Sequence, residues 1–405
     1  MLYHFYEYGR HALTPLRMAA DHTQNLFQNP MNPLSHTMGG RMVAAACEVL
    51  EHSTREYGKP AFNLGFTEVE GQTVMVEEEV VLRKPFGQLK HFKRGCDVRQ
   101  DKMLIVAPMS GHFATLLRGT VEAMLPHYEV YITDWRDAKM TPLYEGHFDL
   151  DDYVDYVMDF LEHLGPGAHV MAVCQPSVPV FTALALMEEE DHPARPASLT
   201  MMGGPIDTRV NPTEVNDFAT KRPLSWFKHN VVTTVPVPNP GMFRRVYPGF
   251  LQLAGFMAMN LSNHMTKHMD MFQHLVEGDG ESADATQAFY EEYRSVMDLT
   301  EEFYLQTVDK VFRRHLLPRH KLTHRGRLVD PSKITRTSIF CVEGELDDIS
   351  GVGQTQAALD LTPNLPKSKK HHFVQKGVGH YGIFNGRRWR ESIAPKVRDF
   401  TADAR

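Results

Sequence analysis

Apolar and polar positions alternate in a regular order of short and long segments between residues 102 and 204. Short apolar runs such as "KMLIV" and "HVMAV" are typical of buried strands. Longer segments with helical periodicity separate them. The clearest is "DLDDYVDYVMDFLEHL", which we expect to form an amphipathic helix that ends at Gly165. The alternation predicts an α/β fold with a mostly parallel central sheet and helices on both faces.

The pattern before this region is different. Residues 1–68 predict a helical N-terminal segment, with breaks at Pro30 and Pro33 and its clearest helix in "GRMVAAACEVLEHSTREYG". Residues 69–205 form the first part of the predicted core. This part opens with two strands, "TVMVEEEVVLRKP" and "GQLKHFKR".

The alternation stops near Ile206 and returns about 125 residues later. Residues 206–331 are rich in Phe, Met, Tyr and His, and we interpret them as a lid or cap insertion. Residues 332–405 resume the core with the predicted strands "TSIFCVEG" and "KKHHFVQ" and a final helix. One sheet therefore carries a long insertion before its last two strands.

Composition excludes several classes of protein. The net charge of -7 argues against nucleic acid as the main ligand. No window approaches the length of a membrane-spanning helix, and the N-terminus lacks an apolar signal core. The four cysteines are far apart with no CxxC pair, so we predict no disulfide framework and no zinc site. A reducing cytoplasm is the expected compartment.

A candidate nucleophile lies in "MAVCQPSVPV", where an apolar strand ends at Cys174 and an apolar helix follows. Open α/β sheets bind ligands at such strand-to-helix joints. In α/β hydrolases the joint is the nucleophile elbow, G-x-S-x-G, but here both glycines are absent and Cys replaces Ser. A helix N-terminus favours the thiolate form. A buried inert cysteine is the plainer alternative. Ser177 is a rival nucleophile, but it lies in the first turn of the helix rather than at the joint, and helix capping is its alternative role.

Two later residues complete a candidate triad. Asp347 follows the strand "TSIFCVEG", with Asp348 as the alternate acid, and His380 lies in a glycine-punctuated loop after the next strand. The order nucleophile, acid, histidine is that of α/β hydrolases. Turn formation or helix capping is the alternative role of such an aspartate.

The same reasoning predicts an oxyanion hole. One donor would be the backbone N–H of Gln175, the residue after the nucleophile, and the other that of Met109 or Ser110 after an earlier strand. His264 and His268 have a spacing that metal ligands can have, but no HExxH motif accompanies them. We therefore predict neither a metal nor a cofactor.

Several long strings resemble the intracellular poly(3-hydroxybutyrate) depolymerases of the cysteine type. These strings are "MLYHFYEYGR", "APMSGHFATLLRGTVEAMLPHYEVYITDWRDA", "VMAVCQPSVPV", "FYLQTVDKVFRRHLLPRH" and "GVGHYGIFNGRRWR". By these motifs the family's nucleophile, acid and histidine fall on Cys174, Asp347 and His380. The resemblance implies an α/β hydrolase that cleaves the ester bonds of a 3-hydroxy acid polymer, without metal or redox cofactor, at the surface of polyester granules.

Some alternatives remain open at this stage. The polyester synthases are similar relatives, so an acyltransferase is a second interpretation, and a non-catalytic granule protein is a third. Coenzyme A is a conceivable acyl acceptor, although no nucleotide-binding motif is present. Aromatic residues of the insertion, such as Trp226, Phe227 and Phe243, would either contact the polymer or form the core of the insertion itself. The oligomeric state does not follow from the sequence.

Overall fold

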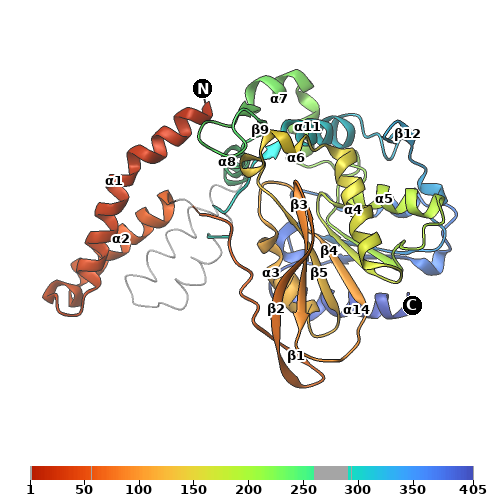
Figure 1. The fold of residues 1–405 in the computed structure, drawn as a ribbon, viewed down its shortest axis with the longest axis horizontal. Helices are drawn as coiled ribbons and strands as arrows, with labels where there is room; N and C mark the ends of the chain where they lie inside the picture. The colour runs from red at the N-terminus through yellow and green to blue at the C-terminus, as the bar shows by residue number, and fades with distance from the viewer. Residues whose placement is uncertain (1, 56, 260–290, 293, 405) are drawn as a thin grey trace.

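The alternating segments assemble into one nine-stranded sheet. We describe residues 2–55, 57–259, 291–292 and 294–404 of a computed structural model. The strand order is β1-β2-β3-β5-β4-β6-β7-β13-β14 (Figure 1). Its members are β1 (Phe66–Val69), β2 (Gln72–Lys84), β3 (Gly87–Arg94), β4 (Lys102–Val106), β5 (Glu129–Trp135), β6 (His169–Val173), β7 (Ser198–Met202), β13 (Ser338–Gly344) and β14 (Lys370–Gln375).

The sheet is antiparallel at one edge and parallel over the rest. Strands β1, β2, β3 and β5 pair antiparallel in succession, whereas all pairs from β5 through β4, β6, β7 and β13 to β14 are parallel. A parallel sheet covered on both faces requires apolar side chains on both sides of each strand. All five residues of β6 are accordingly buried. The prediction of a mostly parallel central sheet is confirmed.

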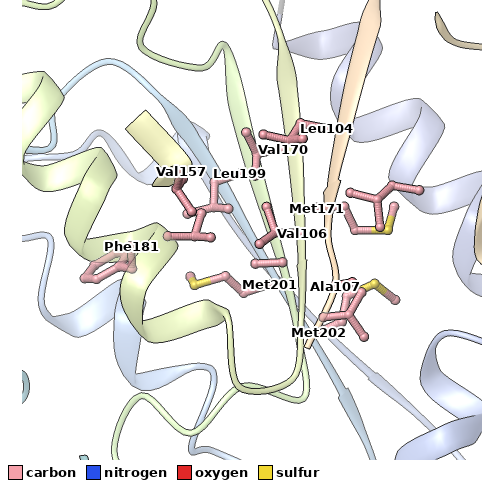
Figure 2. Close-up of a cluster of buried hydrophobic side chains, with 14 of the residues drawn as sticks. Leu104, Val106, Ala107, Val157, Val170, Met171, Phe181, Leu199, Met201 and Met202 are labelled. Carbon is pink, nitrogen blue, oxygen red and sulfur yellow. The ribbon is translucent and has the colours of Figure 1, made fainter. Parts of the chain in front are cut away.

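Helices cover both faces of the sheet. On one face α4 (Leu150–Leu164) packs against α5 (Ser177–Glu189), and the α4 side chain Val157 points toward the strands (Figure 2). Helices of the C-terminal part lie on the opposite face (Figure 2). The remaining core helices are α3 (Arg118–Met124), α12 (Ala357–Asp360), α13 (Gly386–Arg388) and α14 (Ala394–Asp403). As expected, α4 ends at Gly165, which has a φ of 79°.

The segments "HFATLLRGTVEAML" and "GQTQAALDL" each predict one continuous helix, but the helices in the structure are shorter. The segment "HFATLLRGTVEAML" begins with a 3-10 turn, Ala114–Leu117, and only then continues as α3. The segment "GQTQAALDL" forms only the four-residue α12 after a series of turns. In the second case Glu343 accepts hydrogen bonds from the backbone N–H groups of Gly353, Thr355 and Gln356, which holds this segment as a loop.

A long insertion separates β7 from β13. It contains a three-stranded sheet and a two-stranded hairpin in addition to short helices. Its elements are α6 (Glu214–Lys221), α7 (Leu224–Asn230), β8 (Thr233–Thr234), β9 (Arg245–Tyr247), α8 (Gly249–Met259), β10 (Leu299–Thr300), α11 (Glu301–Gln306), a π-helical turn (Thr307–Arg313), β11 (Thr323–His324) and β12 (Arg327–Leu328). The lid role of the insertion stays a prediction.

The N-terminal helices α1 (Leu2–Gln28) and α2 (Met38–Thr54) pair as a hairpin that projects from the rest of the molecule (Figure 1). The start of α1 contacts the insertion. The hydroxyl of Tyr3 donates to Asp298 Oδ2 at 2.7 Å, and the ring of Tyr6 stacks on Phe250 of α8. The segment that we expected to be helical also contains most of β1, which begins at Phe66. None of the helices among the described residues is long and apolar enough to cross a membrane.

Candidate active site

Cys174 follows β6 directly and has a left-handed backbone conformation, with a φ of 66°. A non-glycine residue with positive φ is uncommon and persists only where the surrounding structure fixes it. The Cys174 N–H donates to the carbonyl oxygen of Met202 at 2.7 Å, and the Cys174 carbonyl accepts from the N–H of Ser177 at 3.0 Å. These bonds hold a sharp turn at the carboxyl edge of the sheet. The turn has the form of a nucleophile elbow.

The close approach that motif glycines normally permit is provided here by the neighbouring strand. Gly203 has a φ of 60°, and a Cβ on it would lie 3.1 Å from the ring of His380. A Cβ on Gly204 would lie 2.0 Å from the Ser177 hydroxyl. The pair "GG" after β7 therefore leaves room for the ring of His380 and for the start of α5 close to Cys174. In the sequence this pair was the available signal for the tight packing.

His380 and Asp347 meet at the ends of the last two strands. The two side chains are buried, and His380 Nδ1 lies 2.8 Å from Asp347 Oδ2. The other carboxylate oxygen, Oδ1, accepts hydrogen bonds from the N–H groups of Ile349 and Ser350 at 2.9 and 2.8 Å. The alternate acid, Asp348, is exposed. The structure therefore brings Asp347, and not Asp348, to the histidine.

The electrostatics of the site favour a positive charge on His380. Burial alone lowers its pKa, but the opposing effects of Cys174 and Asp347, by charge and by hydrogen bonding, raise the pKa of His380 well above its ordinary value. Because Nδ1 faces Asp347, Nε2 is the nitrogen left for Cys174. Such an arrangement holds the imidazolium of His380 beside the sulfur of Cys174.

The three candidate oxyanion residues line the same cavity as Cys174. Among the described residues, the backbone N–H of Gln175 makes no hydrogen bond. The N–H of Met109 donates to the side-chain oxygen Oε1 of Gln175 at 3.3 Å. Ser110 is half-buried in the same loop. The sequence analysis named Gln175 and either Met109 or Ser110 as candidate donors, and their role stays a prediction. It did not indicate the hydrogen bond from the Met109 N–H to the Gln175 side chain.

The cavity has a volume of about 620 Å³ and predominantly apolar walls. Loops of the core form one side, and helices and strands of the insertion form the other. Phe227 lines the cavity although it is only 1% exposed, whereas Trp226 and the exposed Phe243 are not among the lining residues. The aromatic residues around the cavity are Phe218, Phe227, Tyr247, Phe303, Tyr304, Phe312, Tyr381 and Phe384.

The rival sites are not supported. Within the described part of the chain, the buried hydroxyl of Ser177 has no hydrogen-bond partner, and Pro176 occupies the N-cap position, so the alternative capping role of Ser177 was wrong. His264 and His268 lie outside the described residues. His147, Asp149 and Asp152 come close enough to hold an ion, but the two aspartates form the capping box of α4.

One residue beneath the site was missed by the sequence analysis. Glu343 is fully buried within β13 and also faces His372 of β14, whose Nε2 lies 2.8 Å from Glu343 Oε2. Burial raises its pKa, but the hydrogen bonds from His372 and three backbone N–H groups prevail and lower it. Glu343 thereby anchors the loop that follows Asp347. The signal in the sequence was a charged residue inside the otherwise apolar run "SIFCVEG".

The strand order and the turn at Cys174 define an α/β hydrolase, and the class is that of the ester hydrolases. The family model "PHB de-polymerase C-terminus" matches residues 203–405, which is half of the chain. The chain belongs to this poly(3-hydroxybutyrate) depolymerase family, which confirms the resemblance drawn from the sequence.

Solved structures resemble the fold at low sequence identity. The lip1 protein of Acinetobacter baumannii AYE is 11% identical with a TM-score of 0.47, and 81% of this chain and 93% of that chain are covered. The carboxylesterase CesB of Bacillus subtilis is 13% identical with a TM-score of 0.42, and 90% of this chain and 99% of that chain are covered. An esterase from Thermogutta terrifontis is 13% identical with a TM-score of 0.42, and 84% of this chain and 97% of that chain are covered. No curated protein matches the chain.

Proposed function

We propose that the protein hydrolyses the ester bonds of poly(3-hydroxybutyrate), with Cys174 as nucleophile, His380 as general acid and base, and Asp347 as the partner that orients the histidine. The observation that carries this proposal is the strained turn at Cys174, which lies beside the buried His380–Asp347 pair with its separation of 2.8 Å. The family assignment supports the polyester as substrate.

The first half of the proposed reaction transfers an acyl group to the enzyme. The Cys174 thiolate attacks the ester carbonyl carbon, a C–S bond forms, and the π electron pair moves onto the carbonyl oxygen. The backbone N–H groups of Gln175 and Met109 stabilise that oxyanion. The intermediate collapses, the C–O bond breaks, and the departing alkoxide takes a proton from His380 Nε2. An acyl-thioester and a hydroxyl-ended chain result.

The second half releases the acid. Neutral His380 removes a proton from water, and the hydroxide attacks the thioester carbonyl. The C–S bond breaks, which restores the thiolate and the imidazolium and frees 3-hydroxybutyrate or an oligomer. Asp347 stays ionised and holds Nδ1 as a donor throughout. Coenzyme A could replace water as the acceptor, which would yield a new thioester instead of an acid.

The apolar cavity suits an uncharged, aliphatic polyester, because its walls offer few polar groups to a charged substrate. The insertion supplies one side of this cavity, and we propose that it covers a polymer segment as a lid. Aliphatic polyester at a granule surface inside the cell would be the natural form of such a substrate.

The decisive experiment measures 3-hydroxybutyrate release from amorphous polymer granules by wild type and Cys174→Ala. Two matched variants serve as controls: Cys96→Ala removes a cysteine remote from the site, and Ser177→Ala removes the buried rival hydroxyl. We expect release to vanish only in Cys174→Ala, with granule binding and melting temperature retained. Activity that survives in Cys174→Ala would refute the proposed nucleophile.

The same assay identifies the acyl acceptor. If water is the acyl acceptor, the product should remain the free acid when coenzyme A is added. If the thiol of coenzyme A is the acceptor, the product should be 3-hydroxybutyryl-coenzyme A. Wild type that releases neither product from the polymer would refute the proposed substrate.

A further inference from the structure

Gln175 takes part in the oxyanion region with two different groups. Its backbone N–H is one expected donor, and its side-chain amide holds the other donor, the N–H of Met109, at 3.3 Å. A backbone N–H can only donate, so the bonded atom of the amide must be its oxygen, Oε1. The orientation of the amide is therefore set by its partner.

This hydrogen bond has a clear physical reason. Met109 and Gln175 are only 4% and 8% exposed and lie against a predominantly apolar cavity. A buried N–H without a partner is energetically unfavourable. Among the described residues, the N–H of Met109 has no acceptor other than Gln175 Oε1. The glutamine side chain thus satisfies, in the free enzyme, a donor that the chemistry requires for the substrate.

We propose that Gln175 Oε1 occupies the oxyanion position in the free enzyme and that the substrate carbonyl must displace it. This inference rests on the proposed function. An amide oxygen and an ester carbonyl oxygen are both neutral acceptors, so the side chain is an internal substitute for the substrate. Gln175 in this role is a positioning residue: it keeps the Met109 N–H oriented and leaves when the carbonyl arrives.

A different role for Gln175 would have the opposite consequence. If Oε1 stayed on Met109 during the reaction, the amide NH2 group of Gln175 or the backbone N–H of Ser110 would act as the second oxyanion donor. That NH2 group has no hydrogen-bond partner among the described residues, so the two roles cannot be separated by its contacts. One substitution separates the two roles, because they predict opposite changes in the affinity of the site for an oxyanion. Removing a competitor tightens binding of an oxyanion, whereas removing a donor weakens it.

The test uses a propyl trifluoromethyl ketone, a reversible probe of cysteine hydrolases. The Cys174 thiolate adds to its carbonyl carbon, a C–S bond forms, and the π pair moves to the oxygen, which becomes a stable oxyanion. The inhibition constant is measured against hydrolysis of p-nitrophenyl butyrate. We compare wild type with Gln175→Met, which has similar length and no strong acceptor, and with Gln175→Glu, which carries a stronger acceptor and no donor.

We expect Gln175→Met to lower the inhibition constant about fivefold, which is the size of one neutral hydrogen bond. Gln175→Glu should raise it about tenfold or more, because a carboxylate competes more strongly for the N–H, with relief at low pH as the carboxylate is protonated. A misfolded site would not bind the probe more tightly, so melting temperature is only a secondary control.

Two results would count against the proposal in different ways. A higher or unchanged inhibition constant in Gln175→Met would overturn the displacement role while leaving the proposed function intact. A wild type that does not bind the ketone through Cys174, judged by comparison with Cys174→Ala, would overturn the proposed function and this inference with it.

Discussion

The two sides of the active-site cavity are built in different ways. On the core side, Asp347 and Glu343 are buried and each accepts several hydrogen bonds from backbone N–H groups of the loop that follows β13. On the insertion side, aromatic rings such as Phe218 and Phe303 form the wall. Directional bonds fix the reacting groups on one side, whereas apolar packing shapes the space for substrate on the other.

This contrast predicts two kinds of mutational effect. Changes on the core side should reduce kcat, because they disturb the chemistry. Changes on the insertion side should act mainly on KM, because they alter contacts that the substrate makes in the ground state and the transition state alike.

The largest effect is expected for Asp347→Asn. The amide cannot hold His380 Nδ1 as a donor in the required tautomer, so kcat for p-nitrophenyl butyrate should fall about thousandfold. Asp348→Asn changes the exposed neighbouring carboxylate and is the matched control, with kcat expected to stay near wild type. Equal losses in the two variants would contradict the choice of Asp347 as the acid.

The next effect concerns the thiolate. Against the lowering effect of burial, Cys174 and Asp347 raise the pKa of His380 well above its ordinary value, so the imidazolium that the proposed mechanism pairs with a Cys174 thiolate persists as pH rises through neutrality. In His380→Ala, iodoacetamide labelling of Cys174 at pH 6.5 should be about a hundredfold slower, as for an ordinary thiol with a pKa near 8.5. The rate is read by mass spectrometry of the peptide that contains Cys174. Labelling at the wild-type rate would mean that His380 does not maintain the thiolate.

Glu343→Gln tests whether the loop behind Asp347 needs a charged anchor. The amide keeps one acceptor for the loop but loses the charge that faces His372. We expect the free energy of unfolding to fall by about 2 kcal/mol, as for a buried charged hydrogen bond, and kcat to fall about tenfold. Denaturant unfolding and steady-state kinetics are the measurements. Unchanged kcat together with reduced stability would show that the anchor serves folding alone.

Phe218→Ala tests the opposite wall. Phe218 lines the cavity and is 44% exposed, so its loss removes apolar contact with the substrate without touching the reacting groups. KM for butyrate esters should rise about fivefold, the size of a partly buried aromatic contact, while kcat changes little. Phe243→Ala is the matched control, because Phe243 is an exposed aromatic residue of the insertion outside the cavity. A fall in kcat without a change in KM would contradict the predicted difference between the two walls.

The smallest effect on activity is expected at Asp298, which joins the N-terminal helix to the insertion. Its Oδ2 accepts from Tyr3, and its Oδ1 accepts from the Gly249 N–H at the start of α8. Burial, reinforced by the charge of Asp137, raises the pKa of Asp298 to about 7. Hydrogen bonds from Gly249 and Tyr3 and the charge of Lys139 oppose this rise.

Because the folded state binds this proton more tightly than the unfolded chain, the free energy of unfolding should decrease as pH rises from about 4 to about 7. Asp298→Asn should flatten that slope, by an amount on the order of a few kcal/mol across the window, with kcat retained. Urea unfolding at a series of pH values measures it. An identical slope in the two proteins would exclude Asp298 as its source.

The sequence predicted the layers of the fold and placed the three proposed reacting residues at one edge of the sheet, because both depend on local order along the chain. The alternation of apolar runs gives the parallel sheet, and the ends of β6, β13 and β14 give the edge at which Cys174, Asp347 and His380 meet. The turn after β13 directs the carboxylate of Asp347, and not that of Asp348, toward His380. The order of two adjacent aspartates in the sequence does not reveal the shape of this turn.

Other features depended on contacts between distant segments and could not be predicted. The bond between Gln175 and Met109 joins residues that are 66 positions apart, and the contact of Tyr3 with Asp298 spans 295 positions. The short α12 is a further case. Its sequence has helical periodicity, but the buried Glu343 of β13 accepts hydrogen bonds from the backbone that precedes α12 and holds it as a loop.

The half-buried position of Cys174 also has a practical consequence for handling the protein. A thiolate that small molecules can reach is a preferred target of peroxide and is converted to sulfenic acid, and the proposed mechanism makes Cys174 such a group. Cys341 is fully buried within β13, and burial raises its pKa well above the ordinary value, so it resists the same reagent. We therefore expect oxidation to reach Cys174 before Cys341, so that activity measured without a reductant would underestimate the enzyme if Cys174 is the nucleophile.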